Sequence, residues 1–196
     1  MLSRYSIWMV LWLVSFSAAA QSSDEESRTG FWAGLDIGVA SMKRSYSMTP
    51  SSSQTTFALT LSGGYAWNPR LLLGVELGGW TLQASDWWWN SNSSQGQAIE
   101  TIFAIARYYP IADSRLFVKG GGGLVHYWTN QPGESGANGW GGMIGVGYDV
   151  YVKGSVRVAP SVSYSFGSFN GAISPPGIMQ DQRYQAITAY LGVTFR

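Results

Sequence analysis

The sequence has no cysteine, a single histidine and few charged residues, which make up 12% of its 196 positions. The absence of cysteine excludes a disulfide framework, a cysteine-based zinc site and a cysteine nucleophile. Soluble domains carry roughly 25% charged residues, so this chain has too little charge to keep an ordinary surface hydrated. Its formal net charge of +1 also gives no electrostatic footprint for nucleic acid.

Long apolar runs are also scarce, and the one at the start has the order of a secretory signal peptide. Arg4 supplies the positive charge, residues 7–14 form the apolar run, and Ala18-Ala19-Ala20 supplies the small-residue cleavage site. A transmembrane helix needs about 20 apolar residues, and this run is roughly half as long. We therefore expect residues 1–20 to be removed by cleavage after Ala20, and residues 21–29 to form a periplasmic tail.

Glycine and aromatic residues are abundant, with 25 glycines and 15% aromatics. From Phe31 onward, large apolar residues alternate with small or polar ones, which is the period of a β-strand. In the first segment Phe31, Leu35 and Val39 share one face, while Asp36 and Gly38 share the other. Eight such segments cover about residues 31–40, 57–67, 71–78, 97–109, 116–128, 140–149, 156–166 and 187–195.

The connections between these segments alternate between long and short. The long ones cover about residues 43–55, 83–96, 129–138 and 167–184, and the short ones 68–70, 110–115 and 151–155. Outer-membrane barrels have short periplasmic turns, long extracellular loops and an even number of strands. Residues 30–196 are therefore predicted to form an all-β domain, an eight-stranded antiparallel up-and-down transmembrane β-barrel.

The alternative is a soluble, lipocalin-like barrel, with the apolar set inside and a charged set outside. In this sequence the residues that alternate with the large apolar ones are mostly Gly, Ala, Ser and Thr. Such residues suit the crowded interior of a narrow barrel better than a hydrated exterior. Aromatic residues also gather at the strand ends, as expected for belts at two membrane interfaces. They are Phe31, Trp67, Tyr109, Tyr148 and Phe195 at one end, and Trp80, Trp128, Trp140 and Phe166 at the other.

Four motifs resemble the small OmpA/OmpX-type outer-membrane β-barrel family, which includes the opacity-type surface proteins. They are Gly30-Phe31-Trp32-Ala33-Gly34, Leu61-Ser62-Gly63-Gly64-Tyr65-Ala66-Trp67-Asn68-Pro69, Ala106-Arg107-Tyr108-Tyr109-Pro110 and Tyr190-Leu191-Gly192-Val193-Thr194-Phe195. The resemblance implies a Gram-negative outer membrane, contact with its lipids and lipopolysaccharide, and assembly by the barrel-assembly machinery through the C-terminal strand. Family members usually end on the aromatic residue that this machinery recognises, whereas here Arg196 follows Phe195.

Charged residues within the strands fix which face is the interior, because an Arg facing lipid at the bilayer midplane costs about 2–4 kcal/mol. On this basis five side chains are turned into the lumen: Asp36, Glu76, Arg107, Lys119 and Arg157. Charges in a low-dielectric interior must pair or lose their charge. We expect a buried ion-pair network that plugs the barrel, with a narrow ion-conducting path as the alternative. Pro160 lies within a strand of a closed barrel, so a bulge or a broken ladder pair is expected there.

Catalysis is not expected, although some eight-stranded outer-membrane barrels remove or transfer acyl chains of lipid A. Such chemistry needs a histidine, a carboxylate and a serine nucleophile. The deacylases carry a Ser two residues after the His, whereas here Trp128 follows His126 at that spacing. His126 is better explained as part of an interfacial belt. No metal-ligand spacing or phosphate-binding loop is present, so neither a metal nor a cofactor is expected.

The long loops are the expected place for contacts outside the cell. Trp87, Trp88 and Trp89 are consecutive, and a strand turns alternate residues to opposite faces, so they cannot all face lipid. They are candidates for a host or surface ligand, since exposed aromatics are favoured contact anchors. Lys43 and Arg44 are candidates for lipopolysaccharide phosphates. The expected function is a non-catalytic structural or surface-interaction protein; a narrow channel and a lipid A-modifying enzyme are the alternatives.

Overall fold

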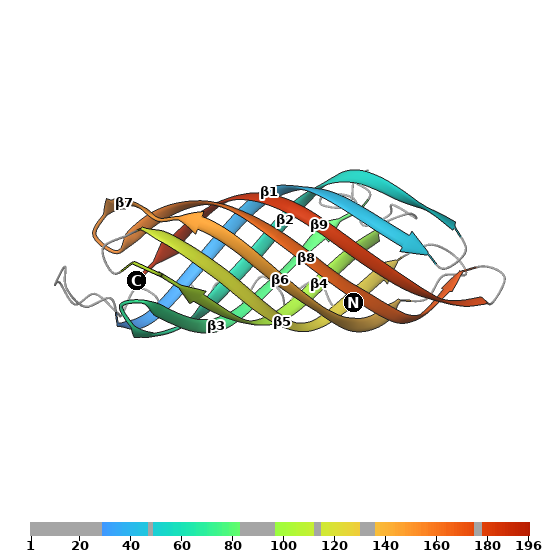
Figure 1. Cartoon of the computed structure of the whole chain (residues 1–196), viewed down its shortest axis with the longest axis horizontal. Coiled ribbons are helices and arrows are strands. Elements are labelled where there is room, and N and C mark those ends of the chain that lie inside the picture. The colour runs from blue at the N-terminus through green and yellow to red at the C-terminus, as the bar shows by residue number, and fades with distance from the viewer. Residues whose placement is uncertain (1–28, 47–48, 83–96, 112–114, 130–135, 175–177) are drawn as a thin grey trace, which may run out of the picture.

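The fold is a closed antiparallel β-barrel (Figure 1). This computed structural model describes residues 29–46, 49–82, 97–111, 115–129, 136–174 and 178–196. The strands are β1 (Gly30–Tyr46), β2 (Thr49–Asn68), β3 (Leu71–Thr81), β4 (Gln97–Tyr108), β5 (Leu116–Thr129), β6 (Ala137–Tyr148), β7 (Val150–Lys153), β8 (Val156–Ser174) and β9 (Ile178–Phe195). None of the described residues forms a helix long and apolar enough to cross a membrane.

Neighbours in the chain pair with one another, and two further pairings close the ring. The sheet runs in the order β6-β5-β4-β3-β2-β1-β9-β8-β7, with β6 also paired to β8. β6 and β7 are two pieces of one strand, separated only by Asp149 and both paired with β8. The nine segments therefore make an eight-stranded up-and-down barrel, which confirms the predicted fold class.

Inside and outside are separated by the alternation along each strand. In β1, Phe31 and Ile37 are exposed while Trp32 and Asp36 are buried. The outer surface carries large apolar side chains on every long strand, as expected for a barrel in lipid. Two aromatic residues assigned above to the interfacial belts depart from that prediction. Trp80 and Tyr109 are 4% and 1% exposed and point into the barrel.

The strands at one end of the barrel are longer than predicted. Lys43 and Arg44 lie within β1, whose pairing with β2 continues to Tyr46 and Thr49. The β8–β9 ladder likewise continues to Ser174 and Ile178. The predicted loops 43–55 and 167–184 are thus largely strand. Their Ser, Thr and Gln residues lack apolar alternation, but ladder hydrogen bonds come from the backbone and need no apolar side chain.

Pro160 coincides with a gap in one ladder. Gly147 of β6 pairs with Ser161, and Val150 of β7 pairs with Val158, so the register is the same on both sides of the gap. Proline has no backbone N–H to donate, and pairing is missing at this point, where β6 ends and β7 begins. The expected irregularity is a broken ladder pair without a bulge.

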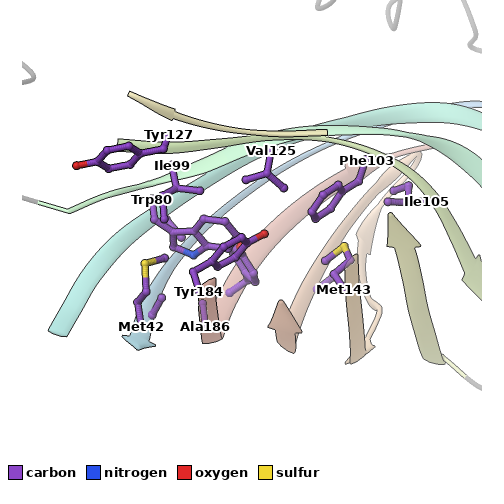
Figure 2. Packing of buried hydrophobic residues seen from close by; sticks show 14 of the residues in the cluster. Met42, Trp80, Ile99, Phe103, Ile105, Val125, Tyr127, Met143, Tyr184 and Ala186 are labelled. Carbon is purple, nitrogen blue, oxygen red and sulfur yellow. The ribbon is translucent and has the colours of Figure 1, made fainter. Parts of the chain in front are cut away.

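Aromatic and aliphatic side chains fill the half of the barrel interior farthest from the short turns. Figure 2 shows Trp80 and Tyr184 side by side, with Met42, Ile99 and Val125 around them. The ring centroids of Trp80 and Tyr184 are 5.8 Å apart. Tyr184 stacks on Phe169 at 5.5 Å, and Phe169 lies 6.0 Å from Tyr127. Eight strands leave an interior just wide enough for side chains to fill, and these rings fill it here.

Candidate functional site

The middle of the lumen contains an ion pair between two strands that are not neighbours. Glu76 of β3 and Lys119 of β5 face each other across the interior, with Nζ and Oε2 2.7 Å apart. Their side chains are only 3% and 4% exposed. Lys119 Nζ also lies 5.7 Å from the centre of the Tyr190 ring. The pair is a charge-assisted hydrogen bond between two buried side chains, which is the setting in which such bonds are strong.

The other charged residues predicted to face the lumen have separate partners. Asp36 is buried and accepts a hydrogen bond of 3.0 Å from the Thr60 hydroxyl. The Arg107 guanidinium is buried and lies over two aromatic rings, at 4.4 Å from the centre of Phe117 and 5.4 Å from that of Trp32.

Arg157 is half-buried in β8, and its backbone position is opposite Thr194 of β9. Thr194 is buried inside the barrel, so Arg157 belongs to the same interior face. Of the five predicted interior charges, the structure joins only Glu76 and Lys119 as an ion pair among the described residues. The expected single network is therefore a set of separate contacts at different levels.

A second ion pair, which the sequence analysis did not predict, lies at the end of the barrel that carries the short turns. Arg196 Nη2 is 3.1 Å from Asp149 Oδ2, and their side chains are 8% and 1% exposed. The Tyr109 hydroxyl donates a 2.7 Å hydrogen bond to the same oxygen of Asp149. Arg196 also donates to the Tyr109 hydroxyl and lies over its ring. These residues close the base of the lumen.

Burial shifts the titration of two members of this basal cluster, each located one residue beyond a strand end. Desolvation raises the pKa of the Tyr109 phenol, so its hydroxyl stays protonated and can donate to Asp149. Desolvation also lowers the pKa of the Arg196 guanidinium, while Tyr109 and Asp149 act in the opposite direction. One feature of the sequence indicates this cluster: Asp149 lies two residues after the interior Gly147, so the strand alternation turns it to the same face.

The structure separates the two basic residues proposed as an extracellular contact. Lys43 is exposed on the outside of β1, opposite Gln185 of β9. Arg44 lies on the opposite face of β1 and donates a 3.2 Å hydrogen bond from Nη1 to Gln97 Oε1. Trp87, Trp88 and Trp89 lie outside the described residues.

His126 is located on the outer face of β5, near the long-loop end. Its Nδ1 lies 2.7 Å from Asn138 Oδ1 of the neighbouring strand β6. Glu100 is directly opposite on the other neighbour, β4. The hydrogen-bond partner of His126, Asn138, is an amide, whereas a nucleophilic triad requires a hydroxyl bonded to the imidazole. Across the described segments, no group of three His, Cys, Asp or Glu residues could hold a metal ion.

One shallow cavity of about 470 Å³ opens on the barrel wall between β6, β8 and β9. Its lining includes Gly141, Gly142 and Gly167 together with Trp140 and Phe166. Trp140 is 70% exposed on the outer surface. Its lining thus combines the outward-facing Trp140 and Phe166 with the buried Tyr184.

A family model and solved structures from the outer membrane are similar to this chain. The model of a family described as outer membrane protein beta-barrel domain matches residues 9–196. Neisserial surface protein A has a similar structure, with a TM-score of 0.54, 20% sequence identity, and coverage of 86% of this chain and 99% of that one. AlkL, solved in DMPC bilayers, gives a TM-score of 0.51 at 13% identity, with coverage of 89% and 93%. No curated protein matches the chain.

Proposed function

The chain belongs to the family of outer membrane protein beta-barrel domains, and from this premise we propose that it is a non-catalytic, plugged barrel. Its role in the outer membrane is that of a structural and surface-contact protein. The observation that carries the proposal is the filling of the lumen at three levels: the rings around Trp80 and Tyr184, the Glu76–Lys119 pair, and the basal pair of Asp149 with Arg196.

The plug is tested by recording conductance from the purified, folded protein in planar bilayers. We expect silence, because each of the three levels consists of side chains that are buried against others. Glu76→Gln is the matched variant, since it removes the carboxylate from the middle of the lumen and retains the shape of the side chain. Long, stable openings of the unmodified protein that vanish in Glu76→Gln would contradict the plug and support a narrow channel.

The outward-facing cations support contact with lipopolysaccharide. Lys43 of β1 is opposite Gln185, and Arg183 lies two residues before Gln185 on β9. Diagonal neighbours of this kind have Cα atoms about 7–8 Å apart, and both side chains are exposed on the outer face. The pair can bind phosphate groups of the outer leaflet. A double variant with Lys43→Gln and Arg183→Gln should bind less lipopolysaccharide than Arg70→Gln, a control at the opposite end.

Trp87, Trp88 and Trp89 remain the proposed anchors for a host or surface ligand. Replacing Trp87 and Trp89 with serine should weaken cell adhesion, because large aromatic side chains supply much of the contact energy in protein interfaces. The migration difference between boiled and unboiled samples should stay unchanged, which shows that the barrel still folds. Adhesion equal to that of the unmodified protein would contradict this assignment.

The absence of catalysis is also part of the proposal. The contact between His126 and Asn138 supports it, because an amide cannot act as the nucleophile of a deacylase. Release of fatty acid from purified lipid A by the folded barrel, lost in His126→Ala, would contradict it.

We further propose signal cleavage after Ala20 and assembly through the strand that contains Phe195. Mass spectrometry of protein from the outer membrane should find Gln21 as the first residue.

A further inference from the structure

The basal end of the lumen has more positive than negative charge. Three arginine side chains, Arg107, Arg157 and Arg196, face this end, and Asp149 is the one carboxylate among the described residues that pairs with any of them. Glu76 is paired with Lys119, and Asp36 accepts from Thr60. Charge inside a protein is costly unless it is compensated, so the excess positive charge requires an explanation.

The strand register places the three arginines on the same interior face near the short turns. Arg157 is opposite Thr194, and the backbone N–H of Arg196 donates to the Ser155 carbonyl at 3.1 Å. Arg157 and Arg196 are therefore diagonal neighbours on the same interior face. Arg107 and Arg196 stand over adjacent rings, at 4.4 Å from Phe117 and 4.9 Å from Tyr109. Those two ring centroids are 5.8 Å apart.

These arginines have many buried nitrogen atoms with no hydrogen-bond partner in the described part of the chain. They are Nε and Nη1 of Arg107, Nε and Nη1 of Arg196, and Nε of Arg157. The Thr194 and Ser62 hydroxyls nearby are also unpartnered, and a Cβ placed on Gly34 would touch both. Asp149 Oδ1, which can only accept, is unpartnered as well. Buried polar groups are satisfied in native proteins, and the five guanidinium nitrogen atoms, which can only donate, require an acceptor.

We propose that a small inorganic anion, a halide or inorganic phosphate, binds at this end of the lumen between Arg107, Arg157 and Arg196. An anion supplies both acceptor capacity for the guanidinium N–H groups and the missing negative charge. Water alone supplies the acceptor but not the charge. The inference goes beyond the proposed function, because it holds whether or not the barrel conducts.

The first test is crystallographic and uses bromide as the probe. Crystals of the folded barrel grown in sodium bromide should show an anomalous peak within hydrogen-bond distance of the three guanidinium groups. The second test measures thermal unfolding at constant ionic strength while sodium bromide or sodium phosphate replaces sodium gluconate. A ligand that binds only the folded state raises its stability with concentration, so we expect the unfolding temperature to rise with bromide, phosphate or both.

Variants assign the effect to the site. A hydrogen bond to a charged group is worth about 1.5–3 kcal/mol, so Arg157→Gln should weaken the apparent affinity about tenfold to 100-fold. Arg70→Gln, which removes an exposed arginine at the same end, should leave it unchanged. If Arg157→Gln does not fold, the anomalous peak and the anion dependence of the unmodified barrel still decide. Stabilisation by phosphate without bromide identifies an oxyanion site, whereas no peak and no anion-specific stabilisation would overturn the proposal.

Discussion

Replacing Lys119 with methionine tests whether the middle of the barrel is dry. The change removes the ammonium group that lies 2.7 Å from Glu76 Oε2 and keeps a flexible side chain of similar length. Because Glu76 is 2% exposed, its carboxylate would be left buried without its partner. Breaking such a pair from one side costs about 3–5 kcal/mol.

The assay is equilibrium unfolding in phospholipid vesicles, with Lys43→Met as the matched control. Lys43 is exposed on the outer face of β1, so its replacement should change the unfolding free energy little. The double variant Glu76→Met, Lys119→Met should recover most of the loss, since apolar residues can replace a buried ion pair at little cost. The two single changes should therefore be strongly non-additive.

Equal, small effects of Lys119→Met and Lys43→Met would refute the reasoning. That result would mean that water screens the Glu76–Lys119 pair, as it screens exposed ion pairs, which typically contribute about 0.2–1 kcal/mol. A hydrated lumen is what a conducting barrel requires. The stability experiment thus tests the plug independently of electrical recording.

Three further changes probe other contacts of the barrel. Tyr109→Phe removes the hydroxyl that bonds Asp149 at 2.7 Å and should lower the unfolding free energy by about 1.5–3 kcal/mol; a loss below about 0.5 kcal/mol would contradict a dry basal cluster. Gly139→Ala should abolish the migration difference between boiled and unboiled samples, because the added Cβ would clash with the Ser168 carbonyl oxygen, whereas Gly120→Ala, with its nearest contact at 3.8 Å, should retain it. Pro160→Ala should introduce a slowly exchanging amide, and fast exchange there would show that the gap has another cause.

The barrel could be predicted from sequence because both of its surfaces impose simple rules. Lipid demands apolar residues at every second position, and a narrow lumen demands small or paired polar ones. Trp80 lies four residues after Glu76, so the alternation along β3 turns both side chains into the lumen. Tyr109 lies two residues after Arg107, so it likewise shares the interior face of Arg107. The place of these two aromatics at the strand ends predicts the interfacial belts, but the face of the strand on which they lie turns both into the lumen. The information was present in the alternation.

Other features could not be predicted, because alternation assigns a face but not a partner. Glu76 and Lys119 lie 43 positions apart on strands separated by β4, and only the stagger of the closed barrel brings them to one level. The Asp149–Arg196 pair depends on the same closure, since β9 must return beside β1 and β8. The sequence predicts one contact from Lys43 and Arg44 because the loss of apolar alternation predicts that the strand ends before them, whereas β1 continues through both residues.

The distribution of the interior charges indicates that they specify register as well as fill space. One of these charges lies on each of β1, β3, β4, β5 and β8: Asp36, Glu76, Arg107, Lys119 and Arg157. A slip of one residue turns every side chain of a strand to the opposite face, which would expose a charge to lipid; for Lys or Arg this costs about 2–4 kcal/mol at the midplane. A slip of two residues keeps the face but moves the strand by about 7 Å, which is enough to separate Glu76 from Lys119. The alternation thus disfavours odd slips of each strand that carries an interior charge, and the cross-lumen pair disfavours even slips of β3 relative to β5.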